Sequence, residues 1–239
     1  AGVTVTFTGA EAGTYAFLAT PTGLAAGTGS FAQVERVEGT AFADTLNAAA
    51  ATSAATLLGL GGHDTITGGT AADALSGGDG NDRLAGGLGA DSLSGGSGMD
   101  LADYSGSDAG VTVDLAAGAG TGGDAQGDTL AGIDGLIGSA HADTLLGYDG
   151  ESADPVDGFT NVFYGGGGGD LLDGRGGADT LFGGDGSDSL VGGTGGDRLS
   201  GDEGDDRLAG GAGDDSILGG AGQDAIVVGG SEGIDSIDG

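Results

Sequence analysis

The sequence predicts an all-β protein whose short strands stack in parallel into a solenoid, and three observations lead to this prediction. A nine-residue pattern recurs along two long blocks of the chain. Gly accounts for 61 of the 239 residues, several times its usual share, which excludes an ordinary helical domain. Leu, Ile, Val and Phe together make up roughly 20% of the chain, the border below which chains bury too little apolar surface to fold. Repetition and added ions, more than a large core, must therefore order this chain.

The repeat itself predicts the geometry of the solenoid. Gly occupies the first, second and fourth positions of most copies, Asp the sixth, and Leu or Ile the eighth, from Leu172 to Ile226 in the second block. Glycine permits a positive φ in a turn, and alternation in a strand points one side chain inward. We therefore expect a six-residue turn and a three-residue strand per copy, with two copies forming one coil of about 18 residues.

The segments outside the two blocks read as degenerate coils of the same solenoid. Asp128, Asp143 and Asn161 each precede an apolar residue by two positions, as the repeat carboxylate does. Two phrases also recur, which indicates an internal duplication within a longer solenoid. The matching segments are residues 1–5 with 109–113 and residues 39–46 with 138–145.

Two further segments have specific expectations. Residues 48–60 fit either a short Ala-rich helix or a coil that has lost its carboxylate, and we favour the coil. Residues 147–160 contain a Pro and four acidic residues and are expected to form a protruding acidic loop. The predicted organisation is an entry segment at 1–58, a first repeat block at 59–103, a spacer at 104–164 and a second repeat block at 165–239.

The charge of the chain restricts its partners. Only 5 basic residues face 37 acidic ones, for a formal charge of −32. Such a chain lacks the basic surface that nucleic acids or anionic membranes require, and it contains neither a membrane-spanning apolar run nor a signal peptide pattern. Without Cys it has no disulfides. Because a compact chain of this charge repels itself, we expect cations to be needed for folding.

An enzyme is not predicted, because the residues for one are missing or explained by the repeat. His63 and His141 both fall on repeat turns, and neither has a second His or a Cys at ligand spacing. The aromatic residues of the spacer could form a ligand platform or cap the interior, and we favour the cap. These residues are Tyr104, Tyr148, Phe159, Phe163 and Tyr164.

The acidic residues of the repeat point to a hard divalent cation. Stacking coils brings the Asp side chains together along both edges of the solenoid, where unneutralised carboxylates would oppose folding. Carboxylates and the backbone carbonyls of Gly-rich turns are the oxygen donors that Ca²⁺ prefers. Zn²⁺ is disfavoured because thiolates and clustered imidazoles are lacking. The repeat therefore predicts calcium binding.

The nonapeptide Gly-Gly-x-Gly-x-Asp-x-aliphatic-x, as in residues 77–85 and 86–94, is similar to that of the repeats-in-toxin (RTX) family of secreted bacterial proteins. The resemblance implies a right-handed parallel β-roll with Ca²⁺ held between turns two repeats apart, by Asp carboxylates and turn carbonyls. The implied metal ligands are Asp64, Asp73, Asp82, Asp91, Asp100, Asp170, Asp179, Asp188, Asp197, Asp206, Asp215 and Asp224, with Gly78, Gly80, Gly87, Gly89, Gly166, Gly168, Gly184, Gly186, Gly193, Gly195, Gly211 and Gly213.

Pairing these carboxylates at a spacing of 18 residues gives eight sites, and about eight Ca²⁺ ions would halve the formal charge. Ala71 replaces a fourth-position Gly, and Arg175 and Asp202 replace second-position Gly. We expect these departures to affect most the sites that include Asp73 and Asp179.

The family resemblance implies a calcium-binding structural module of a larger secreted bacterial protein, one that folds on Ca²⁺ binding outside the cell. The chain begins without Met and ends after a repeat-like phrase, so we expect it to be part of a longer protein. A surface-layer or adhesin-like assembly is the favoured context. The alternatives are the secretion and folding module of an exoenzyme or toxin, and a self-associating matrix protein.

Overall fold

The chain folds into parallel β-solenoid structure. The structure, a computed structural model, describes residues 2–9, 12–17, 28–32, 36–148, 160–227 and 235–238. Apart from one short 3₁₀ helix, η1 (Gly123–Ala125), the regular elements of this described part are all β-strands. The prediction of an all-β parallel solenoid is confirmed. The chain divides into two compact units, Ala1–Asp103 with Asp124–Ile133, and Tyr104–Gly123 with Asp134–Gly239.

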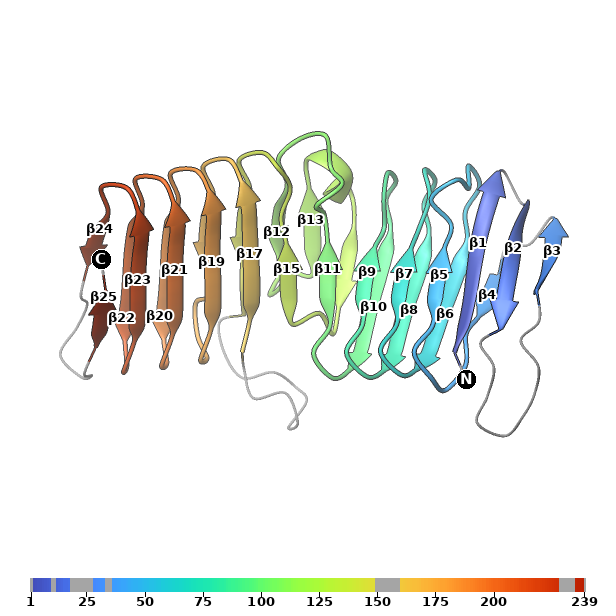
Figure 1. Cartoon of the computed structure of the whole chain (residues 1–239), viewed down its shortest axis with the longest axis horizontal. Helices are drawn as coiled ribbons and strands as arrows, with labels where there is room; N and C mark the ends of the chain where they lie inside the picture. Colours follow the sequence, from blue (N-terminus) through green and yellow to red (C-terminus); the bar gives the residue numbers. More distant parts are fainter. Residues whose placement is uncertain are drawn as a thin grey trace. The chain divides into compact units, whose positions relative to one another are not determined.

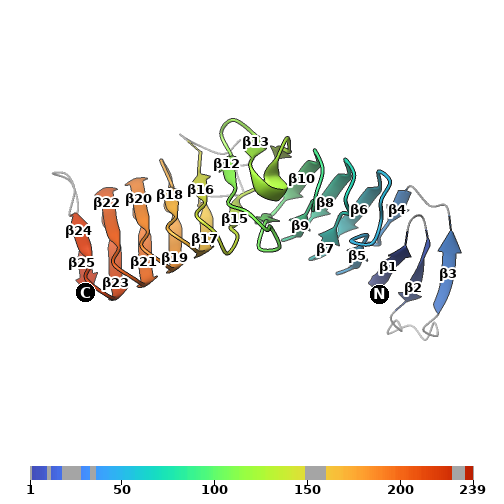
Figure 2. The same cartoon turned by 90° about the horizontal axis from the view of Figure 1, so that it is seen from above.

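In the first unit, successive strands from β4 to β11 alternate between two sheets (Figures 1 and 2). One sheet has the order β11-β9-β7-β5-β1-β2-β3 and the other β14-β10-β8-β6-β4. The strands are β1 (Val3–Gly9), β2 (Ala12–Phe17), β3 (Thr28–Ala32), β4 (Arg36–Glu38), β5 (Thr45–Asn47), β6 (Thr56–Gly61), β7 (Thr65–Thr67), β8 (Ala74–Asp79), β9 (Arg83–Ala85), β10 (Ser92–Ser97), β11 (Leu101–Asp103) and β14 (Thr129–Ala131).

The second unit repeats this arrangement over a longer run of regular coils. Its sheets have the orders β25-β23-β21-β19-β17-β15 and β24-β22-β20-β18-β16-β12-β13. The strands are β12 (Thr112–Asp114), β13 (Ala119–Thr121), β15 (Gly135–Ile137), β16 (Thr144–Leu146), β17 (Val162–Gly167), β18 (Leu171–Asp173), β19 (Thr180–Asp185), β20 (Ser189–Thr194), β21 (Arg198–Glu203), β22 (Arg207–Ala212), β23 (Ser216–Ala221), β24 (Ala225–Val227) and β25 (Ser236–Asp238).

The pairing register confirms that two repeats form one coil. In the regular coils, each residue pairs with the residue 18 positions later, as Leu181 does with Leu199 across β19 and β21. Many strands are longer than the predicted three residues. β19 to β23 each have six, because the first three positions of the following turn also join the ladder, as Gly184 does opposite Asp202. The irregular part of the turn is therefore shorter than expected.

In each unit, the core consists of aliphatic side chains that stack between the two sheets. Leu172, Leu181, Leu190 and Leu208 are fully buried, which confirms the inward orientation of the eighth position. Where the repeat is degenerate, larger residues fill the interior, and Phe163 is also fully buried. A thin core of this kind depends on the regularity of its coils.

The irregular segments behave largely as expected. The segment from residue 48 to residue 60 contains turns and strand β6, which confirms a coil over a helix. Most of the predicted acidic loop, residues 149–159, lies outside the described residues, as does Phe159.

The duplication also has a structural counterpart. β1 and β12 each form an antiparallel hairpin with the next strand and each pair in parallel with the strand of the second matching phrase, Val5 opposite Leu46 and Val113 opposite Leu145.

Candidate metal sites

Aspartate side chains form ladders along the turns that precede the strands. The backbone N–H of an Asp in one coil donates to Oδ1 of the Asp in the next coil, as in Asp170 to Asp188 and Asp188 to Asp206, both at 2.8 Å. This bond joins all eight carboxylate pairs predicted from the 18-residue spacing. The structure thus brings the predicted acidic residues together. Their role as metal ligands stays a prediction.

Further residues join the same ladders. Asp44, Asp143 and Asn161 donate the equivalent bond from their backbone N–H to the Asp of the next coil, Asn161 to Asp179 at 2.7 Å. Asp128 and Asp235 accept it from the preceding coil. Sequence reasoning placed three of these residues on degenerate coils but did not include them among the ligands. The Asp-x-Leu spacing could have identified Asp128 and Asp143, but these phrases do not follow the nine-residue interval of the main blocks.

Nine Asp side chains keep one buried carboxylate oxygen without a hydrogen-bond donor among the described residues. Oδ1 accepts the ladder bond, whereas Oδ2 is fully shielded from solvent. A buried charged oxygen without a partner is strongly unfavourable. Each of these oxygens therefore calls for a cation or a proton. The nine residues are Asp64, Asp82, Asp91, Asp170, Asp179, Asp188, Asp197, Asp206 and Asp215.

The pKa values of these carboxyl groups reflect the same lack of a donor. Burial, followed by repulsion from neighbouring carboxylates, raises the pKa of Asp170 and Asp179 from 3.8 to about 7, although ladder hydrogen bonds oppose the rise. Burial likewise raises the pKa of Asp91 to about 7 and that of Asp64 and Asp197 to about 6. Near neutral pH and without a cation, these groups partly retain their protons.

The turn glycines bring backbone very close to these oxygens. A Cβ on the first-position Gly77 would lie 2.1 Å from Oδ2 of Asp82, and one on Gly192 would lie 2.3 Å from Oδ2 of Asp197. At the fourth position, Gly186 has a φ of +143°, and a Cβ there would lie 1.3 Å from the carbonyl oxygen of Gly168 in the preceding turn. Only glycine fits such contacts, so carbonyl oxygens and carboxylates share the narrow space between successive turns.

Replacing Gly at the second position does not disturb this conformation. Leu60, Arg175 and Asp202 keep positive φ values of 79°, 65° and 71°. The turn that contains Asp179 thus keeps a positive φ at its second and fourth positions, as its neighbours do, and the expected effect of Arg175 on its calcium sites stays a prediction.

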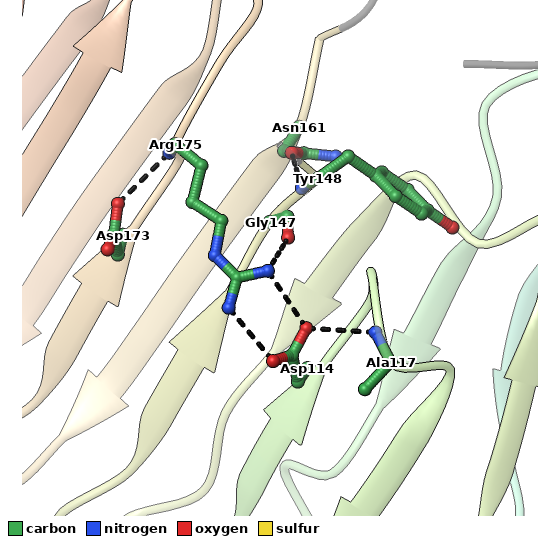
Figure 3. A network of polar contacts seen from close by, with 7 residues as sticks. All are labelled: Asp114, Ala117, Gly147, Tyr148, Asn161, Asp173 and Arg175. Carbon is green, nitrogen blue, oxygen red and sulfur yellow. Dashed lines mark hydrogen bonds and ion pairs between the residues drawn. The ribbon is translucent and has the colours of Figure 1, made fainter. Parts of the chain in front are cut away.

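Arg175 instead neutralises an acid of a more distant coil (Figure 3). Its guanidinium donates to both carboxylate oxygens of Asp114, at 3.0 and 2.8 Å, and to the carbonyl of Gly147 at 2.9 Å. Although partial burial opposes the effect, the hydrogen bonds from Arg175 hold the pKa of Asp114 below its usual value. The negative charge of Asp114 is therefore neutralised by a positively charged side chain of the same protein.

The other sequence-derived candidates occupy structural positions. His63 lies on a turn, where its Nδ1 accepts the N–H of Asn81 at 2.8 Å, and His141 is exposed on another turn. Tyr104 belongs to the buried core with Phe163. Tyr164 is 41% exposed and stacks on Phe182 with ring centroids 5.1 Å apart, so it does not cap the interior.

The donor set of the regular turns fits a hard divalent cation. Within the described residues, no three His, Cys, Asp or Glu side chains cluster closely enough to hold a metal ion by themselves. An ion between two turns would therefore depend on paired Asp carboxylates together with backbone carbonyls, a combination that suits Ca²⁺. The same part of the chain contains no helix of the length and apolarity needed to span a membrane.

Comparison with known proteins agrees with this donor set. A family model described as the RTX calcium-binding nonapeptide repeat matches in four copies, at residues 54–84, 67–102, 157–190 and 191–226. A search of curated proteins finds no match. The matched residues contain all nine of the carboxylates that carry a buried oxygen without a donor among the described residues.

Proposed function

This chain belongs to the RTX calcium-binding nonapeptide repeat family, and from that premise we propose that it is a structural module that Ca²⁺ binding drives to fold. The observation that carries the proposal is the set of nine buried carboxylate oxygens without a hydrogen-bond donor among the described residues. When bound, Ca²⁺ supplies positive charge and six to eight oxygen-coordination positions. The ligands would be the Asp residues and turn glycines that the repeat register predicts.

The chain's own residues explain why folding would depend on the ion. The ladder bonds bring successive carboxylates together, and the first-position glycines leave room for Oδ2 beside the backbone. Each coil adds only two large aliphatic side chains to the core, such as Leu181 and Leu190. Because the ligands converge only when the coils are stacked, the free energy of ion binding contributes directly to folding.

We place this module in a secreted bacterial protein that reaches Ca²⁺ outside the cell. The family resemblance supports export of an unfolded, acidic chain followed by folding where the ion is abundant. The duplicated hairpins at β1 and β12 favour an extended surface-layer or adhesin-like assembly over the export module of an exoenzyme or toxin. Electron microscopy of the full-length protein tests this choice. Calcium-dependent lattices or filaments support the assembly, whereas monomers alone count against it.

Circular dichroism tests the central proposal. The chain should show little strand signal in metal-stripped buffer, gain it cooperatively as Ca²⁺ is added, and lose it again with EGTA. A strand signal that is indifferent to both additions would overturn the proposal.

A further inference from the structure

Twelve turns of the described residues fall into two classes that differ in whether a donor of the chain bonds the carboxylate oxygen Oδ2. In the nine turns whose Oδ2 lacks a donor, the second and fourth residues both have positive φ, for example 102° at Gly184 and 143° at Gly186. We call these the glycine turns. The turns at residues 39–44, 68–73 and 138–143 have no positive φ at either position.

In this second class the turn's own backbone holds the carboxylate. The second-position N–H donates to Oδ2 of the Asp four residues later at 2.5 Å in each case, from Thr40 to Asp44, from Gly69 to Asp73 and from Ser139 to Asp143. We call these the self-bonded turns. The oxygen that is left without a donor in a glycine turn is therefore already hydrogen-bonded here.

Side-chain hydroxyls reinforce two of the self-bonded turns. Ser139 Oγ donates to Oδ1 of Asp143 at 3.0 Å and accepts the N–H of His141 at 3.1 Å. Thr40 Oγ1 makes the same two bonds, with Asp44 and with the N–H of Phe42, each at 3.2 Å. A glycine at the second position cannot make them. These residues thus build a turn that meets its hydrogen-bonding needs without an ion.

The fourth position explains why the two classes are distinct. It is Gly in the glycine turns, whereas Phe42, Ala71 and His141 occupy it in the self-bonded turns. A side chain there disfavours the left-handed backbone, and without that conformation the second-position N–H turns toward the carboxylate. The fourth residue of the turn therefore selects the class.

Asn161 provides an independent example of the same arrangement. Its Oδ1 accepts the N–H of Tyr148 at 3.2 Å, and Tyr148 also lacks a positive φ (Figure 3). A neutral amide stands here in the place of the carboxylate. A carboxylate charge is thus unnecessary where the turn's own N–H bonds the side chain.

We propose that the self-bonded turns are calcium-independent, so that Asp44, Asp73 and Asp143 hold the backbone of their own turns and do not bind a metal ion. This inference rests on the proposed calcium-binding function and refines it. Of the eight predicted carboxylate pairs, only Asp73 with Asp91 includes a self-bonded turn, so the expected number of ions falls from about eight to about seven. Asp64, Asp91 and Asp170 each follow a self-bonded turn in their row of hydrogen-bonded Asp residues. The row of proposed Ca²⁺ sites therefore starts at each of these three residues.

The test converts one class into the other and counts ions. In the double variant S139G/H141G, the turn at 138–143 acquires the Gly-Gly-x-Gly-x-Asp sequence beside the turn of Asp170. Calcium-saturated protein analysed by equilibrium dialysis and atomic absorption should contain one more ion per chain than the unchanged protein. The matched control S139A/H141A removes the same side chains without adding Gly, and its ion count should stay unchanged. Equal counts in the two double variants would overturn the inference.

A second comparison does not depend on forming a new site. Asp73→Asn should leave the number of bound ions unchanged, whereas Asp188→Asn, whose carboxylate is shared by the pairs with Asp170 and Asp206, should lower it by up to two. Loss of an ion in Asp73→Asn would overturn the inference and leave the proposed function intact. An unchanged protein that binds no Ca²⁺ would instead refute the proposed function itself.

Discussion

The regular coils at residues 165–224 and the irregular segments at residues 111–123 and 134–146 belong to the same compact unit and bury similar aliphatic side chains, yet they differ in whether the chain itself supplies donors to the carboxylates. The regular coils leave a buried carboxylate oxygen without a donor in nearly every turn. In the irregular coils, the N–H of Ser139 bonds Asp143, and Arg175 pairs with Asp114. Under the proposed function, the regular coils therefore depend on ions from solution, whereas donors from the chain itself satisfy these carboxylates of the irregular segments.

This difference suggests how the folding of a chain with a thin core can be made to depend on a bound ion. Each regular turn places a buried carboxylate oxygen against glycine backbone without a donor, and the proposed Ca²⁺ would neutralise it. In the self-bonded turns a backbone N–H already bonds the carboxylate, and we propose that these turns do not depend on the ion.

Acid should replace calcium in the regular coils. Burial raises the pKa of Asp170 and Asp179 to about 7, above the usual 3.8, so the protonated form stabilises the metal-free fold. That stabilisation is complete below about pH 4 and is lost as the pH rises through about 7. In metal-stripped protein, the circular dichroism strand signal should therefore grow from about pH 8 to about pH 4. The apparent Ca²⁺ affinity should fall over the same range, because protons compete for the same oxygens. A metal-free signal that is constant with pH, or that grows as pH rises, would contradict this expectation.

The aliphatic stack should be the next most sensitive feature. Leu190 is fully buried, so Leu190→Ala should lower the free energy of unfolding in saturating Ca²⁺ by about 2–5 kcal/mol. Leu171 on the adjacent strand is 40% exposed, and Leu171→Ala should cost less than about 1 kcal/mol. Urea unfolding measures both. Equal losses would show that the eighth position does not dominate the core.

The fourth-position glycine should tolerate no side chain. Gly186→Ala would place a Cβ 1.3 Å from the carbonyl oxygen of Gly168 at a φ of +143°, and we expect a loss of about 1–3 kcal/mol together with fewer bound ions. Gly106, which has no heavy atom within 4 Å of an added Cβ, supplies the control. Gly106→Ala should change the stability by less than about 0.5 kcal/mol. Thermal unfolding of the two variants side by side decides the point.

The internal ion pair should contribute least. Asp114→Asn removes the charge partner of Arg175 in a partly buried bidentate contact, and we expect a loss of about 1 kcal/mol that shrinks at high salt. Glu38→Gln breaks the exposed pair with Arg36 and should change the stability by less than about 0.5 kcal/mol. If both variants proved neutral, Arg175 would not stabilise the irregular coils.

The regular coils could be predicted almost completely from the sequence, because every copy sets the same chemistry at the same interval. The spacing of Asp188 from Asp170 and of Leu199 from Leu181 identified both the ladder partners and the buried stack. The exposed position of Tyr164 follows from the same register, because Asn161 puts Phe163 at the inward position and adjacent strand residues face opposite sides of the sheet, and the expectation of an aromatic cap overlooked this alternation.

The sequence by itself determined the period, the pairing of coils and the identity of the acids, since these follow from a repeat whose turns and strands form locally. Only the tertiary structure decided which carboxylates are left with an unsatisfied oxygen. That outcome depends on backbone torsions set by contact with the preceding turn, as at Gly186 against Gly168, and on partners brought together from 61 residues apart, as in Arg175 with Asp114. Such contacts form only once the coils have stacked, because the residues that make them lie far apart in the sequence.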